Sequence, residues 1–288
     1  ATASPEDTVT QIFAEKFAEE ISELSDGRMK IQVYANSTLG GDRDLLETCA
    51  DGDIPFVVQN TAPQVSFMGD LAVFDLPCVF DSLDECREKI DNPEFYELIS
   101  NVYTEGGYHL LGMADQGFRV MSTNKPVYSF SDFKGQKIRT MENSYHMDFW
   151  KKLKASPTPM SFSEVYIGLQ QGTIDAAENA ICAYYSSAYY EVCKELSLTE
   201  HFYGATALLM SKKVFASLTE EQQTILKEAA AEARDLQRAD VAERETRYLD
   251  ELQAEDGVTV HEDVDKDAFR AITDEIYPKF YDTIPQDL

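Results

Sequence analysis

The chain has 288 residues and carries 52 acidic against 25 basic side chains, a formal net charge of -27. This charge argues against nucleic acid and anionic membrane surfaces as partners. No apolar run approaches the length of a membrane span, while the length allows two lobes of ordinary size.

The first predicted element is a helix that Ser4 caps, that has Pro5 at its first position and that Gly27 ends. Apolar residues recur along it at helical spacing and give it one face for packing. These residues are Val9, Ile12, Phe13, Phe17, Ile21 and Leu24.

A βαβ unit is predicted next. Apolar residues alternate over 29–33, a helical pattern covers 42–50, and a second apolar strand covers 54–58. Gln59 and Asn60 follow this second strand. Because open α/β sheets bind ligands beyond the carboxyl ends of their strands, Asn60 is a candidate ligand contact.

The apolar run over 74–80 is interrupted by Pro77. Proline cannot donate to a sheet, so this run indicates a connection under the core rather than a central strand. Two helices are predicted after it, at 82–90 and 93–104.

Two strands, at 108–114 and 118–123, are separated only by residues 115–117. We interpret them as one long strand that passes between two lobes, with the first domain crossing at that point. Strands at 195–199 and 204–211 then return the chain to the first lobe. Lobe I is predicted to comprise 1–116 and 205–244, and lobe II to comprise 117–204 and 245–288.

Residues 156–179 combine a helix with a polar cluster. Ser161 and Glu164 form a capping box, and apolar residues at helical spacing continue until Gly172. A short strand at 173–175 is predicted to end in polar residues, where α/β sheets bind ligands. These polar residues are Asp175, Glu178 and Asn179.

A second capping box, of Thr219 and Gln222, starts a helical pattern that continues without Gly or Pro until Gly257. A pattern of this length usually spans more than one structural unit. The other predicted elements are strands at 137–140 and 258–261 and helices at 144–154 and 265–277.

The stretch 156–179 also resembles the signature of the extracytoplasmic solute-binding proteins of TRAP transporters, the DctP family. It contains the letters PTPM, EVY, LQ and EN in the family's order. Further motifs extend the resemblance over nearly the whole chain: Leu39-Gly40, 74–77, Gly117-Phe118-Arg119, 132–139, Thr199 with His201, and 218–223.

This resemblance implies a fold and a function. The family captures organic acids outside the cell for sodium- or proton-driven uptake. It implies an α/β, two-lobed, periplasmic-binding-protein-like fold with a ligand cleft between the lobes and a long helix braced across both. The implied partners are a small organic acid and the membrane subunits of a TRAP transporter, and we expect a monomer.

The resemblance also assigns roles to residues. Arg139 matches the arginine that clamps a carboxylate, and a guanidinium suits that role because its paired donors match two carboxylate oxygens. Arg119 matches the second arginine, and Asn179 matches an asparagine that contacts the carboxylate or a hydroxyl. One departure surrounds Asn179, where alanines replace the family's Gly, Gln and Pro, so the local backbone is expected to differ slightly. These alanines are Ala176, Ala177 and Ala180.

Four further residues are candidate contacts. Phe162 matches an aromatic residue that packs on the ligand in relatives, although its spacing also fits a core position. Asp42 and Asn60 lie where family members place polar contacts from the first lobe. Asn143 follows the clamp and is placed to reach a hydroxyl.

The ligand is predicted to be a hydroxylated monocarboxylate, such as a uronate or related sugar acid. The amide side chains of Gln59 and Asn60 favour this class, because sialic-acid binders have an acidic residue at the second position. C4-dicarboxylates are the second alternative and sialic acid is the third.

Two alternatives belong to other functional classes. An α/β enzyme could use Asp175 and Glu178 as a carboxylate pair, but the sequence has no nucleophile, phosphate-loop or dinucleotide motif. A sensor that binds the same ligand and reports to a receptor cannot be distinguished by sequence.

We expect no cofactor and no metal site, because the four histidines lack metal-ligand spacing. The protein is expected to be exported to the periplasm, with a signal peptide already removed. Cys78 with Cys86, or Cys182 with Cys193, could form disulfides, but buried thiols are the favoured interpretation.

Overall fold

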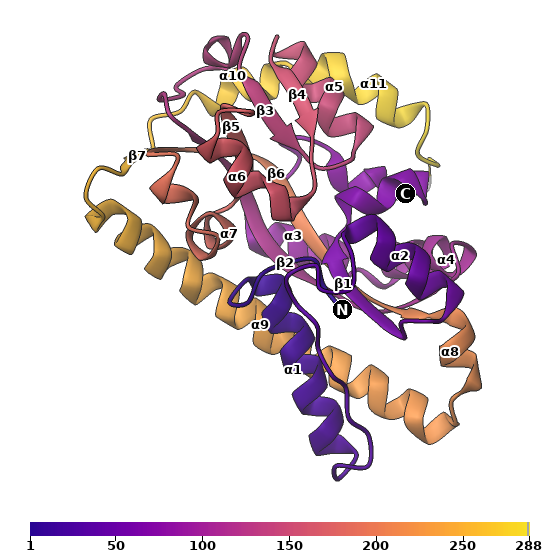
Figure 1. The fold of residues 1–288 in the computed structure, drawn as a ribbon. Helices are drawn as coiled ribbons and strands as arrows, with labels where there is room; N and C mark the ends of the chain where they lie inside the picture. Colours follow the sequence, from indigo (N-terminus) through magenta and orange to yellow (C-terminus); the bar gives the residue numbers. More distant parts are fainter. Residues whose placement is uncertain (287) are drawn as a thin grey trace.

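A mixed β-sheet runs through the molecule, with helices packed around it (Figure 1). The computed structural model describes residues 1–286 and 288, without the side chain of residue 130. The strand order is β1-β6-β2-β5-β3-β4, and β7 pairs with β6. The strands are β1 (Phe56–Asn60), β2 (Tyr108–Thr123), β3 (Lys137–Thr140), β4 (Ser156–Pro159), β5 (Ala176–Ala180), β6 (Glu195–Ser211) and β7 (Thr259–His261).

The predicted long strand over 108–123 is confirmed as β2. The two strands predicted at 195–199 and 204–211 are likewise one strand, β6, which pairs with β2 in antiparallel fashion along its length. A register shift occurs between Asp115 and Gly117, where Gly117 lies opposite Gly204. The two longest strands therefore share an irregular point near their middles.

The helices agree with the predicted positions in most of the chain. They are α1 (Val9–Leu24), α2 (Asp42–Asp51), α3 (Leu83–Ile90), α4 (Pro93–Glu105), α5 (Ser144–Lys152), α6 (Val165–Gln170), α7 (Ile181–Ser186), α8 (Lys212–Ser217), α9 (Glu220–Ala254), α10 (Lys266–Ala271) and α11 (Thr273–Tyr281). The single last helix predicted at 265–277 is thus two helices. Short 3₁₀ turns include η2 (Gly69–Asp75) and η4 (Phe162–Glu164). The apolar run over 74–80 forms no strand, as predicted.

The prediction for the N-terminal region was wrong in two respects. The first helix begins at Val9 rather than Pro5, because Thr8 is the N-cap and its Oγ1 accepts a hydrogen bond from the Gln11 amide at 3.3 Å. Residues 29–33 form no strand; their apolar side chains only pack against a buried cluster. The expected βαβ unit is therefore absent, and β1 pairs instead with β6 in antiparallel fashion.

Two strands are displaced from their predicted positions. Strand β1 includes Gln59 and Asn60, which were predicted to follow it. Strand β5 begins after residues 173–175, so Glu178 and Asn179 lie inside it. The Ser161 side chain makes no capping hydrogen bond, and a 3₁₀ turn precedes α6. Strand β4 was not predicted because two of its four residues are prolines, which its position at the sheet edge tolerates.

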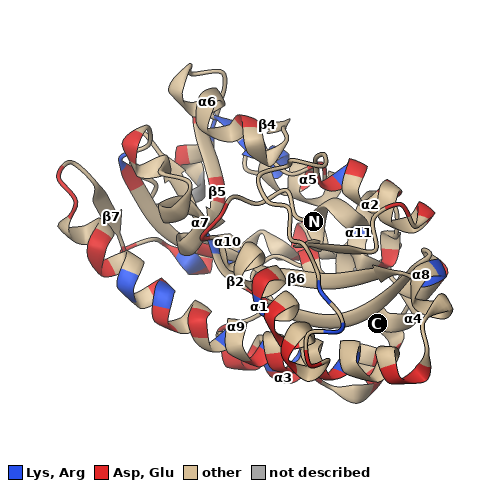
Figure 2. Ribbon diagram, turned by 60° about the horizontal axis from the view of Figure 1, so that its bottom comes forward, with Lys and Arg blue, Asp and Glu red and all other residues tan. Residues whose placement is uncertain are grey.

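Helix α9 has the predicted capping box of Thr219 and Gln222 and continues for 35 residues. At 1.5 Å per residue it is about 52 Å long. It packs against α1, β2 and α7, and Figure 1 shows it extending along one side of the whole molecule. Figure 2 shows acidic residues repeated along its length.

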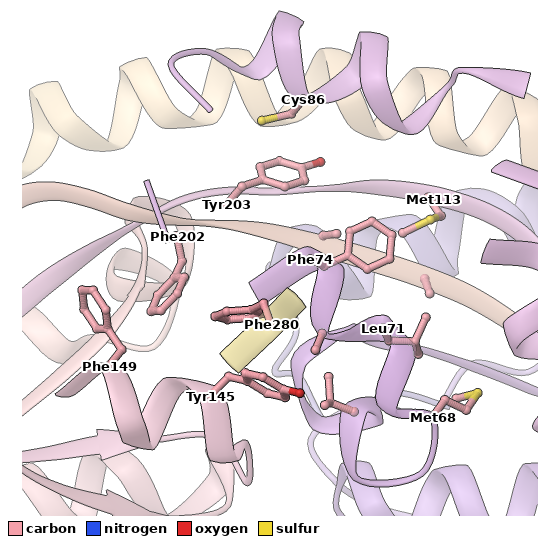
Figure 3. Close-up of a cluster of buried hydrophobic side chains, with 14 of the residues drawn as sticks. Met68, Leu71, Phe74, Cys86, Met113, Tyr145, Phe149, Phe202, Tyr203 and Phe280 are labelled. Atoms are coloured by element: carbon pink, nitrogen blue, oxygen red, sulfur yellow. The ribbon is translucent and has the colours of Figure 1, made fainter. Parts of the chain in front are cut away.

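The largest apolar cluster joins elements from distant parts of the chain. Figure 3 shows Leu71 and Phe74 of η2 on one side, Tyr145 and Phe149 of α5 on the other, and Phe280 of α11 nearby. The rings of Tyr145 and Phe280 are 4.5 Å apart between centroids. The C-terminal helix is therefore fixed against the core.

All five cysteines are free thiols, and four of them are buried. Within the described part of the chain, no helix combines the length and apolar character that crossing a bilayer would require.

Candidate functional site

A cleft lies beside the irregular point of β2 and β6. It contains about 540 Å³ of empty space, part of it open to solvent. Segments far apart in the sequence supply its walls: the N-terminal residues 3–10, the start of α2, the end of β1, the middle of β2, β3, η4 and the end of β5. Six of the seven predicted contact residues line it: Asp42, Asn60, Arg119, Arg139, Phe162 and Asn179.

The sheet positions the arginines. Arg139 is the third residue of β3, which is held between β4 and β5, and its neighbours in register are Thr158 and Ala177. Arg119 lies opposite Ala180 across the antiparallel pair β2 and β5. Both side chains are almost fully buried, with exposed fractions of 3% for Arg139 and 2% for Arg119.

Arg119 is neutralised within the protein. Its guanidinium forms an ion pair with Glu178, and Nη2 donates to Glu178 Oε1 at 3.1 Å and to the Glu178 carbonyl oxygen at 2.7 Å. Burial alone would raise the pKa of the Glu178 carboxyl, but the Arg119 charge outweighs it and holds that pKa far below its ordinary value. Glu178 therefore stays ionised as the partner of Arg119.

Arg139 has no such partner. Its Nε and Nη2 donate to the Met160 carbonyl oxygen at 3.0 and 2.8 Å. No carboxylate of a described residue lies within 4.0 Å of its nitrogens. Burial lowers the pKa of the Arg139 guanidinium, and the nearby Arg119 charge lowers it further, yet arginine remains protonated at neutral pH. The cleft thus contains a buried positive charge that forms no direct ion pair with a described carboxylate.

Three amide side chains form the polar lining. Asn179 Oδ1 accepts from Arg119 Nη1 at 3.2 Å and from the Ala180 amide at 2.9 Å. Asn60 Nδ2 donates to Gln116 Oε1 at 2.8 Å. Gln116 was missed in the sequence because a single glutamine inside a strand belongs to no pattern.

Phe162 and Asp42 complete the cleft beside Arg139. The Phe162 ring centroid is 5.9 Å from the Arg139 guanidinium carbon, and the ring lines the cleft while also packing against a buried apolar cluster. Burial raises the pKa of the Asp42 carboxyl to about 6, although the Arg139 charge opposes this shift. Asp42 is therefore predominantly ionised at neutral pH.

Two amides that sequence analysis associated with the ligand are used elsewhere. Asn143 does not line the cleft: it caps α5 by accepting from the Tyr145 and His146 amides at 2.9 and 3.0 Å, and it donates to the Ala62 carbonyl at 2.9 Å. Gln59 is buried on the other side of β1 and donates to the Asp42 carbonyl at 3.1 Å.

Two histidines lie buried behind Arg119. His201 Nε2 is 3.6 Å from Glu178 Oε2, and His146 Nε2 is 3.0 Å from Asp75 Oδ1. Burial lowers the pKa of the His201 ring. These side chains support the ion pair from behind and do not line the cleft.

The acidic pair considered for catalysis is not assembled. Asp175 is exposed before β5 and accepts a hydrogen bond from the Lys137 amide at 2.8 Å, whereas Glu178 is fully buried. The two carboxylates serve separate structural roles. Among the described residues, no group of three or more metal-ligating side chains occurs.

Comparison with known proteins assigns the chain to a family. Residues 1–283 match the family described as bacterial extracellular solute-binding protein, family 7, DctP.

Three solved TRAP solute-binding proteins each superpose with a TM-score of 0.94. One from Sulfitobacter sp. NAS-14.1, with bound β-D-galacturonate, is 33% identical, with 99% of this chain and 95% of that chain covered. One from Chromohalobacter salexigens, with bound D-glucuronate, is 30% identical, with 99% and 95% covered. The ectoine-binding protein of Halomonas elongata is 30% identical, with 99% and 93% covered.

These matches extend over both halves of the sheet, so they confirm the two-lobed fold implied by the sequence motifs. The chain belongs to the DctP family of extracytoplasmic solute-binding proteins, the substrate-capturing components of TRAP transporters.

Proposed function

We propose that the chain captures a hydroxylated monocarboxylate, such as a uronate or a related sugar acid, outside the cell for uptake through TRAP membrane subunits. The observation that carries this proposal is that the buried Arg139 guanidinium donates only to a carbonyl oxygen and forms no direct ion pair with a described carboxylate. Such a buried cation is costly, and an organic carboxylate bound directly to it would compensate its charge. Arg119 is already paired with Glu178, so a ligand carboxylate would stabilise its charge less.

The charge of Asp42 favours one carboxylate over two. Its carboxyl has a pKa of about 6 and is ionised at neutral pH. It would repel the second carboxylate of a C4-dicarboxylate but would accept a hydrogen bond from a ligand hydroxyl. A sugar acid supplies both the single charge and the hydroxyls.

The solved relatives support this ligand class without fixing it. Two of them hold uronates, while a third of equal structural similarity binds ectoine. Membership of the family therefore does not determine the ligand. The proposal depends on the cleft residues of this chain.

We place the hinge between lobes where Gly117 of β2 lies opposite Gly204 of β6, which divides the sheet near the predicted boundaries at 116/117 and 204/205. The protein acts as a monomer in the periplasm and catalyses no reaction. The separation of Asp175 from Glu178 supports the last point. A receptor that took the place of the permease would recognise the same ligand-bound protein.

A thermal-shift screen tests the ligand class. The purified protein is heated with D-galacturonate, D-glucuronate, D-gluconate, sialic acid, succinate and ectoine. A ligand at a hundred times its Kd stabilises the folded state by about 2.7 kcal/mol, which raises Tm by several degrees. A shift with the sugar acids supports the proposal, and a shift with succinate or ectoine alone contradicts it.

Arg139→Ala tests the clamp. The variant should fold, because the side chain contributes little apolar packing, and should lose measurable binding in calorimetric titration. Arg28→Ala is the control, since it removes an exposed cation that pairs with Glu221 and does not line the cleft. Its Kd should stay within about threefold of the wild type. Equal losses of affinity in the two variants would show that Arg139 acts through its charge alone and does not bind the carboxylate directly.

A further inference from the structure

Gln116 joins three elements at the cleft. It lies within β2 at the register shift, where its side chain lines the cleft. Its Oε1 accepts from Asn60 Nδ2 of β1 at 2.8 Å and lies 3.5 Å from Arg119 Nη1. Its Nε2 donates to Thr10 Oγ1 of α1 at 2.9 Å.

The orientation of this amide chain is fixed at one end by the backbone. The Ala62 amide is 2.8 Å from Asn60 and can only donate, so the oxygen of Asn60 must face it. The nitrogen of Asn60 then faces Gln116, so the oxygen of Gln116 must accept the hydrogen bond. The Gln116 nitrogen consequently points away from Arg119, toward Thr10. The nearby guanidinium, which also only donates, favours the same orientation.

The position of Gln116 is fixed as well. Gly204 leaves room for it, because a Cβ added at residue 204 would lie 2.9 Å from the Gln116 Cβ. The backbone of one strand thus holds the side chain of the other.

Each amide nitrogen carries two hydrogens. Within the described residues, Asn60 Nδ2 and Gln116 Nε2 each use one of them in this chain. The second hydrogens are therefore available to a ligand. Asp42, near Arg139 in the same cleft, offers an acceptor instead.

We propose that Gln116 is a specificity-determining residue that, together with Asn60, donates hydrogen bonds to hydroxyl oxygens of the sugar acid. The ligand carboxylate occupies Arg139, its hydroxyl hydrogens reach Asp42, and other hydroxyl oxygens face the amide pair. This assignment rests on the proposed function. The amide pair of Gln116 and Asn60 would select acids that present oxygen acceptors on the side away from Asp42.

The test compares hydroxylated acids with matched acids that lack hydroxyls. Calorimetric titration or NMR measures the Kd of D-galacturonate and D-glucuronate against tetrahydropyran-2-carboxylate, and of D-gluconate against hexanoate. Gln116→Ala should weaken the best-bound sugar acid about tenfold, because a hydrogen bond is lost and Asn60 is released. The affinity for its matched acid should remain within about twofold, because the carboxylate contacts persist.

Two variants guard against a general loss of structure. Gln64→Ala removes a buried amide that accepts from the Tyr103 hydroxyl outside the cleft, and it should leave both affinities unchanged. Gln116→Met fills a similar space without a charge and without an N–H donor, so it should also weaken the sugar acid selectively. It replaces the alanine variant if that variant fails to fold.

The outcomes separate the two proposals. If the wild type binds none of the three sugar acids, the proposed function fails and the role of Gln116 fails with it. If the wild type binds one and Gln116→Ala is unaffected, or loses both matched ligands equally, only the role of Gln116 is refuted. A selective loss of the hydroxylated acid supports it.

Discussion

The two arginines of the cleft differ in their partners rather than in their burial. Arg119 is held by Glu178, so its charge is compensated before any ligand arrives. Arg139 bonds only a carbonyl oxygen among the described residues and keeps its charge for an incoming anion. Since a compensated cation attracts an anion less strongly, we assign the larger share of affinity to Arg139.

Asp42→Asn tests whether the charge of Asp42 discriminates between one carboxylate and two. At pH 8 the wild-type carboxyl, with its pKa of about 6, is ionised and repels a second carboxylate. The variant should therefore raise the affinity for succinate relative to D-galacturonate by about tenfold at pH 8. The gain should shrink at pH 5, where the wild-type carboxyl is largely protonated.

Calorimetric titrations at both pH values measure this ratio. Asp53→Asn, which removes an exposed charge, is the control and should not change it. A gain of equal size at pH 5 and pH 8 would show that ionisation of Asp42 is not the cause.

At the residue scale, sequence motifs predicted most of the cleft lining. Arg139, Arg119 and Asn179 belong to motifs and do meet in one cleft, although their contact with a ligand remains a prediction. Asn143 does not join them. Its position directly before a predicted helix was an available N-cap signal, and the structure uses it in that way. Gln116 carried no signal, because its role depends on a strand pairing that is distant in sequence.

At the scale of elements, the types were predicted better than the boundaries. Helix α9 was correct because its capping box and uninterrupted pattern are local signals. Strand β5 was displaced because alanines and acids have low strand propensity, and its pairing with β2 and β3 overrides that propensity. The error mattered, since it placed Glu178 beyond the end of a strand instead of opposite Met121 within the sheet.

Gly204→Ala tests the contact between the crossing strands. The added Cβ would lie 2.9 Å from the Gln116 Cβ and 3.1 Å from the Gly117 carbonyl oxygen. The backbone must shift, so we expect a loss of about 1–3 kcal/mol in the free energy of unfolding, measured by urea denaturation. Gly69→Ala is the control, because nothing lies within 4 Å of its added Cβ. Similar losses in both variants would indicate a general glycine effect.

At the scale of the whole molecule, α9 places an acidic side chain against the crossing. Glu245 approaches Gly117 of β2. Burial raises the pKa of its carboxyl to about 7, and the charges of Asp115 and Glu200 add to the shift while Arg87 opposes it. The ordinary value is 4.5, so the folded state holds this proton more tightly than the unfolded state.

The free energy of unfolding should therefore fall as pH rises from about 4.5 to about 7, because deprotonation is harder in the folded state. Glu245→Gln removes this dependence. The variant should be more stable than the wild type by about 2 kcal/mol at pH 8 and equally stable near pH 4. Urea denaturation across this range measures both. A pH-independent difference would trace the effect to packing instead of ionisation.

The crossing between the two halves of the sheet also has a mechanical consequence. It consists of two hydrogen-bonded strands, β2 and β6, and the continuous helix α9 runs alongside. Because the hinge that we propose lies within these regular elements, we expect opening to spread a small elastic twist over them. We expect the joint to return without refolding, so that the strength of the ligand contacts sets the residence time of the cargo.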